Sequence, residues 1–214
     1  MTSVWLDIPL ADYEGHMALP AVGQAQLIAR LFGELIRTRR PSSVALMGCA
    51  GGNGFEHLIG SAAERIEGVD INERYLEKAR ERNGSALPGL ALHAADIQCD
   101  AAIFDPVDLI YAALVLEYVD LGAAIRTLRR HCRAGGTLAT LIQLPHRSQG
   151  HVSASPYTSL GRLGPAMRLV SGDDLIREAA GAGFRLEEAK TYATAAGKEF
   201  ALHRFTAAPG TATK

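Results

Sequence analysis

The sequence predicts an α/β fold in which a doubly wound, mostly parallel sheet carries helices on both faces. First, short apolar runs typical of buried strands alternate along the chain with amphipathic helical segments. Second, a glycine-rich turn at residues 48–54 follows the first apolar run, and polar residues end the next runs. Ligands in such sheets bind beyond the carboxyl ends of the strands, so these observations also predict where a site lies.

The composition is typical of one folded domain. The chain has 214 residues, 48% of them hydrophobic and 21% charged, which is enough apolar surface to form a core. The 22 basic and 23 acidic residues nearly balance, so we expect no nucleic-acid partner. We find no signal-peptide pattern, no apolar run of membrane-spanning length and no zinc-like ligand spacing. Three cysteines without a pairing pattern favour a cytoplasmic location. The absence of metal-ligand spacing among the histidines and cysteines predicts no metal site.

The first half of the chain predicts strands that are each followed by a turn or a helix. An apolar stripe with Pro20 in its first turn indicates the first helix, and Asn72 is a typical N-cap for a later one. In order, the expected elements are a helix over residues 20–37, a strand over 44–47, a helix starting near residue 55, a strand over 65–70, a helix over 73–82 and a strand over 90–95.

The second half continues the alternation and ends in a hairpin. Ser171 and Asp174 resemble a capping box at the start of the last helix. The final two strands are separated by only a short segment, which favours an antiparallel hairpin over a crossover. The expected elements are a strand over residues 107–112, a helix over 121–132, a strand over 137–144, a helix over 172–181 and strands over 184–191 and 199–205. The segment 146–167 is too long for an ordinary loop, and we expect it to face the substrate.

Two features of the first half suit a nucleotide-like ligand. Glycines in the turn 48–54 let the backbone approach a ligand, and a following helix would present free N–H groups to it. Asp70 ends the second strand, where a carboxylate can accept hydrogen bonds from both hydroxyls of a ribose. Nicotinamide dinucleotide enzymes and S-adenosylmethionine (SAM) enzymes share this pair of features, so both cofactors remain open on these residues alone.

Five segments together resemble the class I SAM-dependent methyltransferases. They are VALMGCAGGNGF at 44–55, GVDI at 68–71, AADI at 94–97, FDPVDLIYAALVLEY at 104–118 and RAGGT at 133–137. The resemblance covers about residues 37–205. It implies a seven-stranded Rossmann-like sheet in the order 3-2-1-4-5-7-6, with the last strand antiparallel. It also implies a transferase that moves a methyl group from SAM to an acceptor, which we expect to be a small molecule.

The resemblance also implies which residues bind the cofactor. Asp70 would bind the ribose and Asp96 the adenine amino group. The full set expected from the four strand ends is Gly48, Cys49, Ala50, Gly52, Asn53, Asp70, Ile71, Asp96, Ile97, Ala112, Leu114 and Tyr118. The chain departs from the family at Leu46, where an acid usually helps to hold the methionine ammonium. Asp12 or Glu14 is a candidate replacement.

The chain is expected to have three parts: a lid segment and helix over residues 1–40, the SAM-binding domain over 41–207 and a tail over 208–214. Residues 5–20 are rich in aromatic and ionisable groups, which suits a helical lid over the cofactor. Tyr13, His16 and Met17 would then cover the methionine moiety. The alternative is a segment that merely packs on the core.

Four residues are candidates for contact with the acceptor. His146, His151 and Tyr157 follow the fifth strand, and Glu117 follows the fourth. Each can move a proton, and histidine titrates nearest neutrality. Two other functional classes remain open, a non-catalytic SAM-binding or interaction protein and an NAD(P)-dependent oxidoreductase. Ala50, at a motif glycine position, and the lack of a second catalytic domain disfavour the oxidoreductase.

Overall fold

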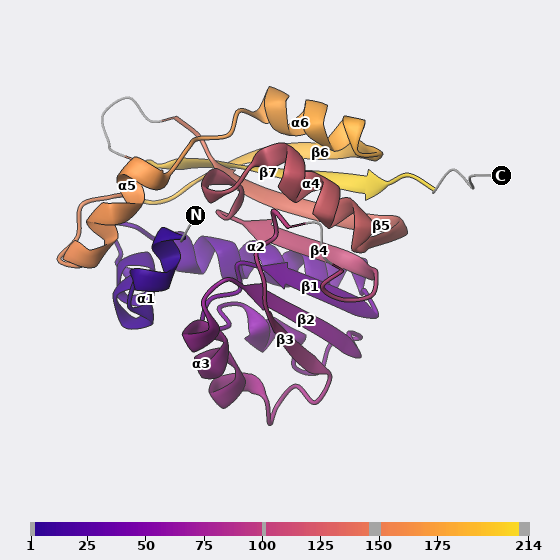
Figure 1. Cartoon of the computed structure of the whole chain (residues 1–214), viewed down its shortest axis with the longest axis horizontal. Coiled ribbons are helices and arrows are strands. Elements are labelled where there is room, and N and C mark those ends of the chain that lie inside the picture. The colour runs from indigo at the N-terminus through magenta and orange to yellow at the C-terminus, as the bar shows by residue number, and fades with distance from the viewer. Residues whose placement is uncertain (1–2, 100–101, 146–150, 210–214) are drawn as a thin grey trace.

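A computed structural model describes residues 3–99, 102–145 and 151–209. Its strands form one sheet in the order β3-β2-β1-β4-β5-β7-β6, which confirms the expected topology (Figure 1). The five strands β3, β2, β1, β4 and β5 are parallel to one another, and β7 is antiparallel to both β5 and β6. The bounds are β1 Ser43–Met47, β2 Arg65–Asp70, β3 Leu90–Ala94, β4 Val107–Ala113, β5 Cys132–Gln143, β6 Phe184–Ala193 and β7 Glu199–Ala207.

Helices cover both faces of this sheet. In β1, Val44 and Leu46 belong to one apolar cluster and Ala45 and Met47 to another, as expected when successive side chains point to opposite faces. The α-helices are α1 Leu10–Ala18, α2 Gln24–Arg39, α3 Glu73–Asn83, α4 Leu121–Arg130, α5 Leu163–Ala166 and α6 Gly172–Gly181. Short 3-10 helices are η1 Val4–Asp7, η2 Phe55–Leu58, η3 Leu116–Tyr118 and η4 Thr158–Arg162. Side chains of α2 and α3 enter the first cluster, and those of α4 and α6 enter the second.

Two helix starts agree with their sequence signals. The Asn72 side chain accepts a hydrogen bond from the backbone N–H of Arg74 at 3.2 Å, and the Ser171 hydroxyl accepts one from the N–H of Asp174 at 3.0 Å. Both contacts satisfy a donor that the first helical turn leaves free. These residues therefore mark the helix boundaries as predicted.

Three element boundaries were predicted wrongly. The first long helix starts at Gln24 because Gly23 before it adopts a left-handed conformation, with φ of 65°. Phe55 begins only the four-residue η2, since Gly60 has φ of 71° and the chain must reach β2 at Arg65. β5 begins at Cys132, where it pairs with Val107 of β4 across an irregularity in the register. The expected full helix after the glycine turn is therefore absent from the described structure.

Two segments distant in the sequence cover the carboxyl edge of the sheet together. We call residues 3–18 and 151–167 the cap. They share an apolar cluster built on Ile8, Leu160 and Leu163, and the Ser159 hydroxyl donates to the Asp12 carboxylate at 2.6 Å. In Figure 1, α1 and α5 lie next to each other at one end of the molecule. Within the described residues, no helix combines the length and apolar character needed to cross a bilayer.

Candidate functional site

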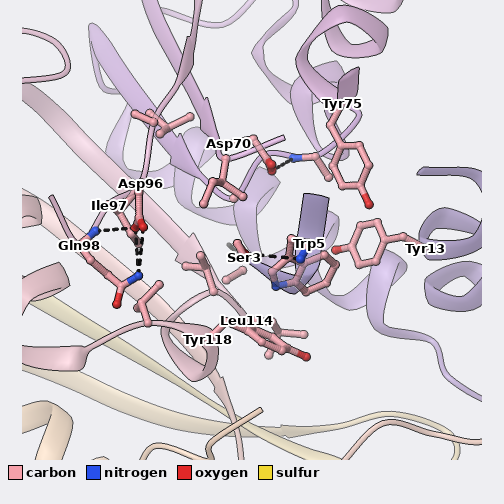
Figure 2. Close-up of a pocket in the computed structure, with 18 residues that line it drawn as sticks. Ser3, Trp5, Tyr13, Asp70, Tyr75, Asp96, Ile97, Gln98, Leu114 and Tyr118 are labelled. Carbon is pink, nitrogen blue, oxygen red and sulfur yellow. Dashed lines mark hydrogen bonds between the residues drawn. The ribbon is translucent and has the colours of Figure 1, made fainter. Parts of the chain in front are cut away.

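A cavity opens where the strands β1 to β4 end beneath the cap (Figure 2). Its cavity volume is about 90 Å³. We call it the first cavity. It is lined by Ser3, Trp5, Tyr13, Gly48, Ala50, Val69, Asp70, Ile71, Tyr75, Ala95, Asp96, Ile97, Gln98, Ala113, Leu114, Val115, Tyr118 and Val119.

Asp70 joins the end of β2 to the glycine turn. One carboxylate oxygen accepts the N–H of Ala50 at 2.9 Å, and the other accepts the N–H of Asn72 at 2.9 Å. Burial raises the pKa of Asp70 above its ordinary value, while backbone N–H groups favour its charged form. A carboxylate has about four acceptor sites, so each oxygen can still accept a hydrogen bond from a ligand hydroxyl.

Asp96 supplies the second carboxylate of the wall. Its oxygens accept hydrogen bonds from Gln98, from the backbone N–H at 2.9 Å and from the side-chain amide at 3.1 and 3.2 Å. The Gln98 amide oxygen in turn accepts the N–H of Asp120 at 2.7 Å. This chain of contacts ties the end of β3 to the start of α4 and fixes the Asp96 side chain at the cavity.

Aromatic rings form part of the wall of the first cavity. Trp5 lies edge-on to Tyr13 and to Tyr118, with ring centroids 5.4 and 5.0 Å apart. The Tyr75 hydroxyl donates to the carbonyl of Ile8 at 2.8 Å, so α3 holds the first cap segment in place. Burial, and then the charge of Asp70, raise the pKa of Tyr13 and Tyr75. These tyrosines therefore stay neutral near pH 7.

A second cavity adjoins the first and lies under both cap segments. Its wall shares Trp5, Tyr13, Leu114 and Tyr118 with the first cavity. The remaining lining residues are His16, Met17, Gln24, Gln143, His151, Val152, Ser153, Leu160, Leu163 and Met167. The wall is thus mostly apolar and contains neither Asp nor Glu, and a few polar side chains can orient a ligand in it.

Glu117 lies beside this second cavity without lining it. It is 1% exposed, and one of its oxygens accepts the backbone N–H of Gln143 at 2.8 Å. The other oxygen is buried and has no hydrogen-bond partner. Burial raises the pKa of Glu117 to about 7, so its carboxyl can exchange a proton near neutral pH.

The structure brings most of the predicted cofactor residues together. Those that line the first cavity are Tyr13, Gly48, Ala50, Asp70, Ile71, Asp96, Ile97, Leu114 and Tyr118. His16 and Met17 line the second cavity instead. Cys49 and Ala112 are buried in the core, and Gly52 and Asn53 line an outer depression beside Glu14.

The acceptor-side candidates separate. His151 lines the second cavity, whereas Tyr157 lines a surface depression and packs its hydroxyl against Gly15 of α1. His146 lies outside the described residues. Asp12 and Glu14 were the candidates to replace the acid missing at Leu46, and neither lines the first cavity. Glu14 forms an ion pair with Arg82 at 2.5 Å, and Asp12 accepts a hydrogen bond from Ser159.

Sequence reasoning missed several lining residues. Tyr75 and Gln98 follow Asp70 and Asp96 by five and two residues, so proximity to a predicted strand-end acid was the available signal. Ser3 reaches the cavity only because the cap folds back over the sheet. Among the described residues, no cluster of three or more His, Cys, Asp or Glu has metal-binding geometry.

Comparison with known proteins agrees with this geometry. Residues 46–140 match the family model described as a methyltransferase domain. No curated protein sequence matches the chain. Solved structures with the same fold include the N-methyltransferase NodS from Bradyrhizobium japonicum WM9 in complex with S-adenosylhomocysteine (SAH), at 20% identity and a TM-score of 0.65, covering 86% of this chain and 87% of that chain.

Two further structures are comparably similar. The 1,6-didemethyltoxoflavin-N1-methyltransferase of Burkholderia thailandensis has 13% identity and a TM-score of 0.69, covering 93% of this chain and 84% of that one. Magnesium protoporphyrin IX methyltransferase from Synechocystis PCC 6803 has 15% identity and a TM-score of 0.64, covering 87% and 81%. At these identities the structures establish the fold, and the family model establishes the domain. Residues 46–140 therefore match a methyltransferase domain, and S-adenosylmethionine is the cofactor that this match and the SAM- or SAH-bound neighbours support.

Proposed function

We propose that SAM binds in the first cavity and that a small-molecule acceptor binds in the second. The observation that carries this proposal is the shared wall of the two cavities. Leu114 and Tyr118 belong to that wall and to the motif that resembles the family segment bordering the methyl group. An acceptor in the second cavity would therefore lie on the methyl side of the cofactor.

The residues of the first cavity suit SAM. Asp70 keeps acceptor sites for two ribose hydroxyls, and Asp96 keeps them for an exocyclic amine. The backbone of Gly48 and Ala50 forms part of the wall, so a ligand can contact the turn directly. Bound SAM supplies an electrophilic methyl group on a sulfonium. The aromatic cap residues would exclude water from that group.

The remaining task of the protein is to align the acceptor and to take up its proton. Alignment alone supplies about 7–11 kcal/mol of barrier reduction in favourable cases. Of the predicted acceptor-side residues, Glu117 and His151 lie at or beside the second cavity, and both can accept a proton. Of the two, Glu117 has a buried free oxygen and a pKa of about 7, which suits general-base catalysis.

Calorimetry with SAH tests the proposed cofactor site. Replacing Asp70→Asn should weaken SAH binding by about 10- to 150-fold, because a charge-assisted hydrogen bond contributes roughly 1.5–3 kcal/mol. Asp173→Asn, at an exposed position of α6, is the matched control and should bind normally. Thermal unfolding must show that both variants are folded, since Asp70 also holds two backbone N–H groups. Unchanged affinity in folded Asp70→Asn would refute the assignment.

A further inference from the structure

Lys198 is a buried charge beside the second cavity. It precedes β7, which runs antiparallel to β5, so it lies at the same sheet edge as the carboxyl end of β5. Its side chain is enclosed, with the residue only 1% exposed. The turn that carries it is fixed by the hydrogen bond from the Thr194 N–H to the Lys198 carbonyl at 2.9 Å. The backbone position of Lys198 is therefore fixed.

Among the residues that the structure describes, the Lys198 ammonium has one hydrogen-bond partner. Its Nζ donates to the carbonyl of His151 at 2.7 Å, and an ammonium has three donors. Among the described residues, no carboxylate forms an ion pair with it. Glu199 is next in the chain and is exposed, and Glu117 bonds to Gln143 instead. A buried charge without an opposite charge is unfavourable, which makes the site a candidate for an anionic ligand.

Other polar groups converge on the same place. The His151 carbonyl also accepts the Gln143 side-chain amide at 3.0 Å, and both residues line the second cavity. His16 lines it as well, and its Nδ1 is buried without a hydrogen-bond partner. The charge of Lys198 contributes, after burial, to lowering the pKa of His16, so the two groups interact electrostatically and His16 is neutral at pH 7. A neutral imidazole can donate one hydrogen bond to an anion.

We propose that the acceptor is an apolar small molecule that carries a carboxylate, bound with that carboxylate beside His16 and Lys198. This inference rests on the proposed use of the second cavity by the acceptor. The aromatic and aliphatic wall takes the apolar body. Lys198 supplies the opposite charge, and the unpartnered imidazole of His16 supplies a donor. The cavity wall itself contains no Asp or Glu, and the raised pKa of the neighbouring Glu117 reduces its negative charge near pH 7.

The charge preference can be measured on the full chain before any acceptor is known. Benzoate and benzamide have nearly the same shape and differ in charge. Trp5 is the one tryptophan of the chain and lines both cavities, so its fluorescence reports binding in the presence of saturating SAH. Ligand-observed NMR gives an independent dissociation constant. Benzoate should bind at least about tenfold more tightly than benzamide, as expected for charge-assisted hydrogen bonds.

The Lys198→Met variant identifies the source of this preference. Methionine keeps an unbranched side chain in the buried position, and removing a buried unpaired charge is expected to leave the fold intact. The preference for benzoate should disappear in Lys198→Met and persist in Lys190→Met, which changes an exposed lysine of β6. Equal binding of the two probes by the parent, no benzoate binding at all, or an unchanged preference in Lys198→Met would overturn the inference.

The same measurements separate this inference from the proposed function. SAH binding is measured first by calorimetry, without either probe. If SAH binds and the probes are not distinguished, the carboxylate proposal fails while the cofactor site stands. If SAH does not bind, the proposed function fails, and the benzoate preference measured without SAH still decides whether Lys198 recognises an anion.

Discussion

Glu117 combines burial, a free oxygen and proximity to the acceptor side of the site. In the unfolded chain its carboxyl titrates near 4.5 and in the fold near 7. Between these values the folded protein holds the extra proton, so the free energy of unfolding contributed by this group falls as pH rises through that window. The same desolvation that destabilises the charged form gives the group a pKa suited to accept a proton from substrate.

The Glu117→Gln variant should therefore change how stability depends on pH. Gln is neutral at every pH, so the difference in unfolding free energy between variant and parent should shift in favour of the variant by roughly 3 kcal/mol between pH 4.5 and pH 8. Denaturant unfolding at several pH values measures it. His16 and His203, whose pKa values are lowered by burial, titrate in both proteins and cancel in the difference. If the difference in unfolding free energy does not depend on pH, the pKa of Glu117 is not raised in the folded protein.

Ala50 is a residue whose backbone conformation favours glycine. Its φ is 46°, in the left-handed region, where a Cβ costs roughly 1–2 kcal/mol. The position matches a glycine of the family motif. The alanine that replaces this glycine is therefore held in a strained backbone conformation. The N–H of Ala50 bonds to Asp70, which holds the turn in this conformation.

Ala50→Gly should stabilise the protein by several tenths of a kcal/mol up to about 1 kcal/mol, because the relieved strain exceeds the added chain entropy of glycine. Ala180→Gly, within α6, is the control and should destabilise by up to about 1 kcal/mol. The midpoint of thermal unfolding of each variant shows whether its substitution stabilises or destabilises the protein. A lower midpoint for Ala50→Gly would show that the turn is not strained.

At the scale of elements, the packing of α1 against the segment before η4 depends on one glycine. A Cβ added at Gly15 would overlap the hydroxyl and ring of Tyr157, whereas one added at Gly161 of η4 would meet no atom within 4 Å. Gly15→Ala should therefore separate the two cap segments and weaken SAH binding, because Trp5 and Tyr13 line the first cavity from the same segment. Gly161→Ala should leave SAH affinity unchanged. Calorimetry on the two variants compares them directly, and equal affinities would exclude coupling through this contact.

The elements that follow local rules were predictable from the sequence. The strands and their order, Asn72 as a cap and Asp70 at a strand end all depend on nearby residues or on the family pattern. The cap was only partly predictable. A lid over residues 5–20 was expected, but the hydrogen bond that joins it to residues 151–167 links positions 147 residues apart, and no periodicity encodes that pairing. The burial of Lys198 was not predictable either, because a single lysine before a strand is usually exposed to solvent.

At the scale of the whole molecule, the sheet brings the strand-end residues of the site together, and the cap covers them. The chain order places β1 and β4 side by side at the centre, so the glycine turn and Leu114 face each other across neighbouring strand ends. Open α/β sheets bind ligands at this reversal of strand order. The cap then adds residues from two segments distant in the sequence to walls that the sheet alone leaves open. Closure of the site is thus a property of two distant segments acting together.

Hydrogen exchange with and without SAH tests whether the cap responds as one unit. Because residues 3–18 and 151–167 share a cluster and the Ser159–Asp12 hydrogen bond, a ligand that contacts Trp5 and Tyr13 should slow exchange in both segments. At SAH concentrations about 100 times the dissociation constant, the slowing can reach about a hundredfold. Peptides of α6 and β6, which line neither cavity, serve as the internal control. Slowing confined to residues 3–18 would mean that the second segment moves independently, and the acceptor side would then open without releasing the cofactor.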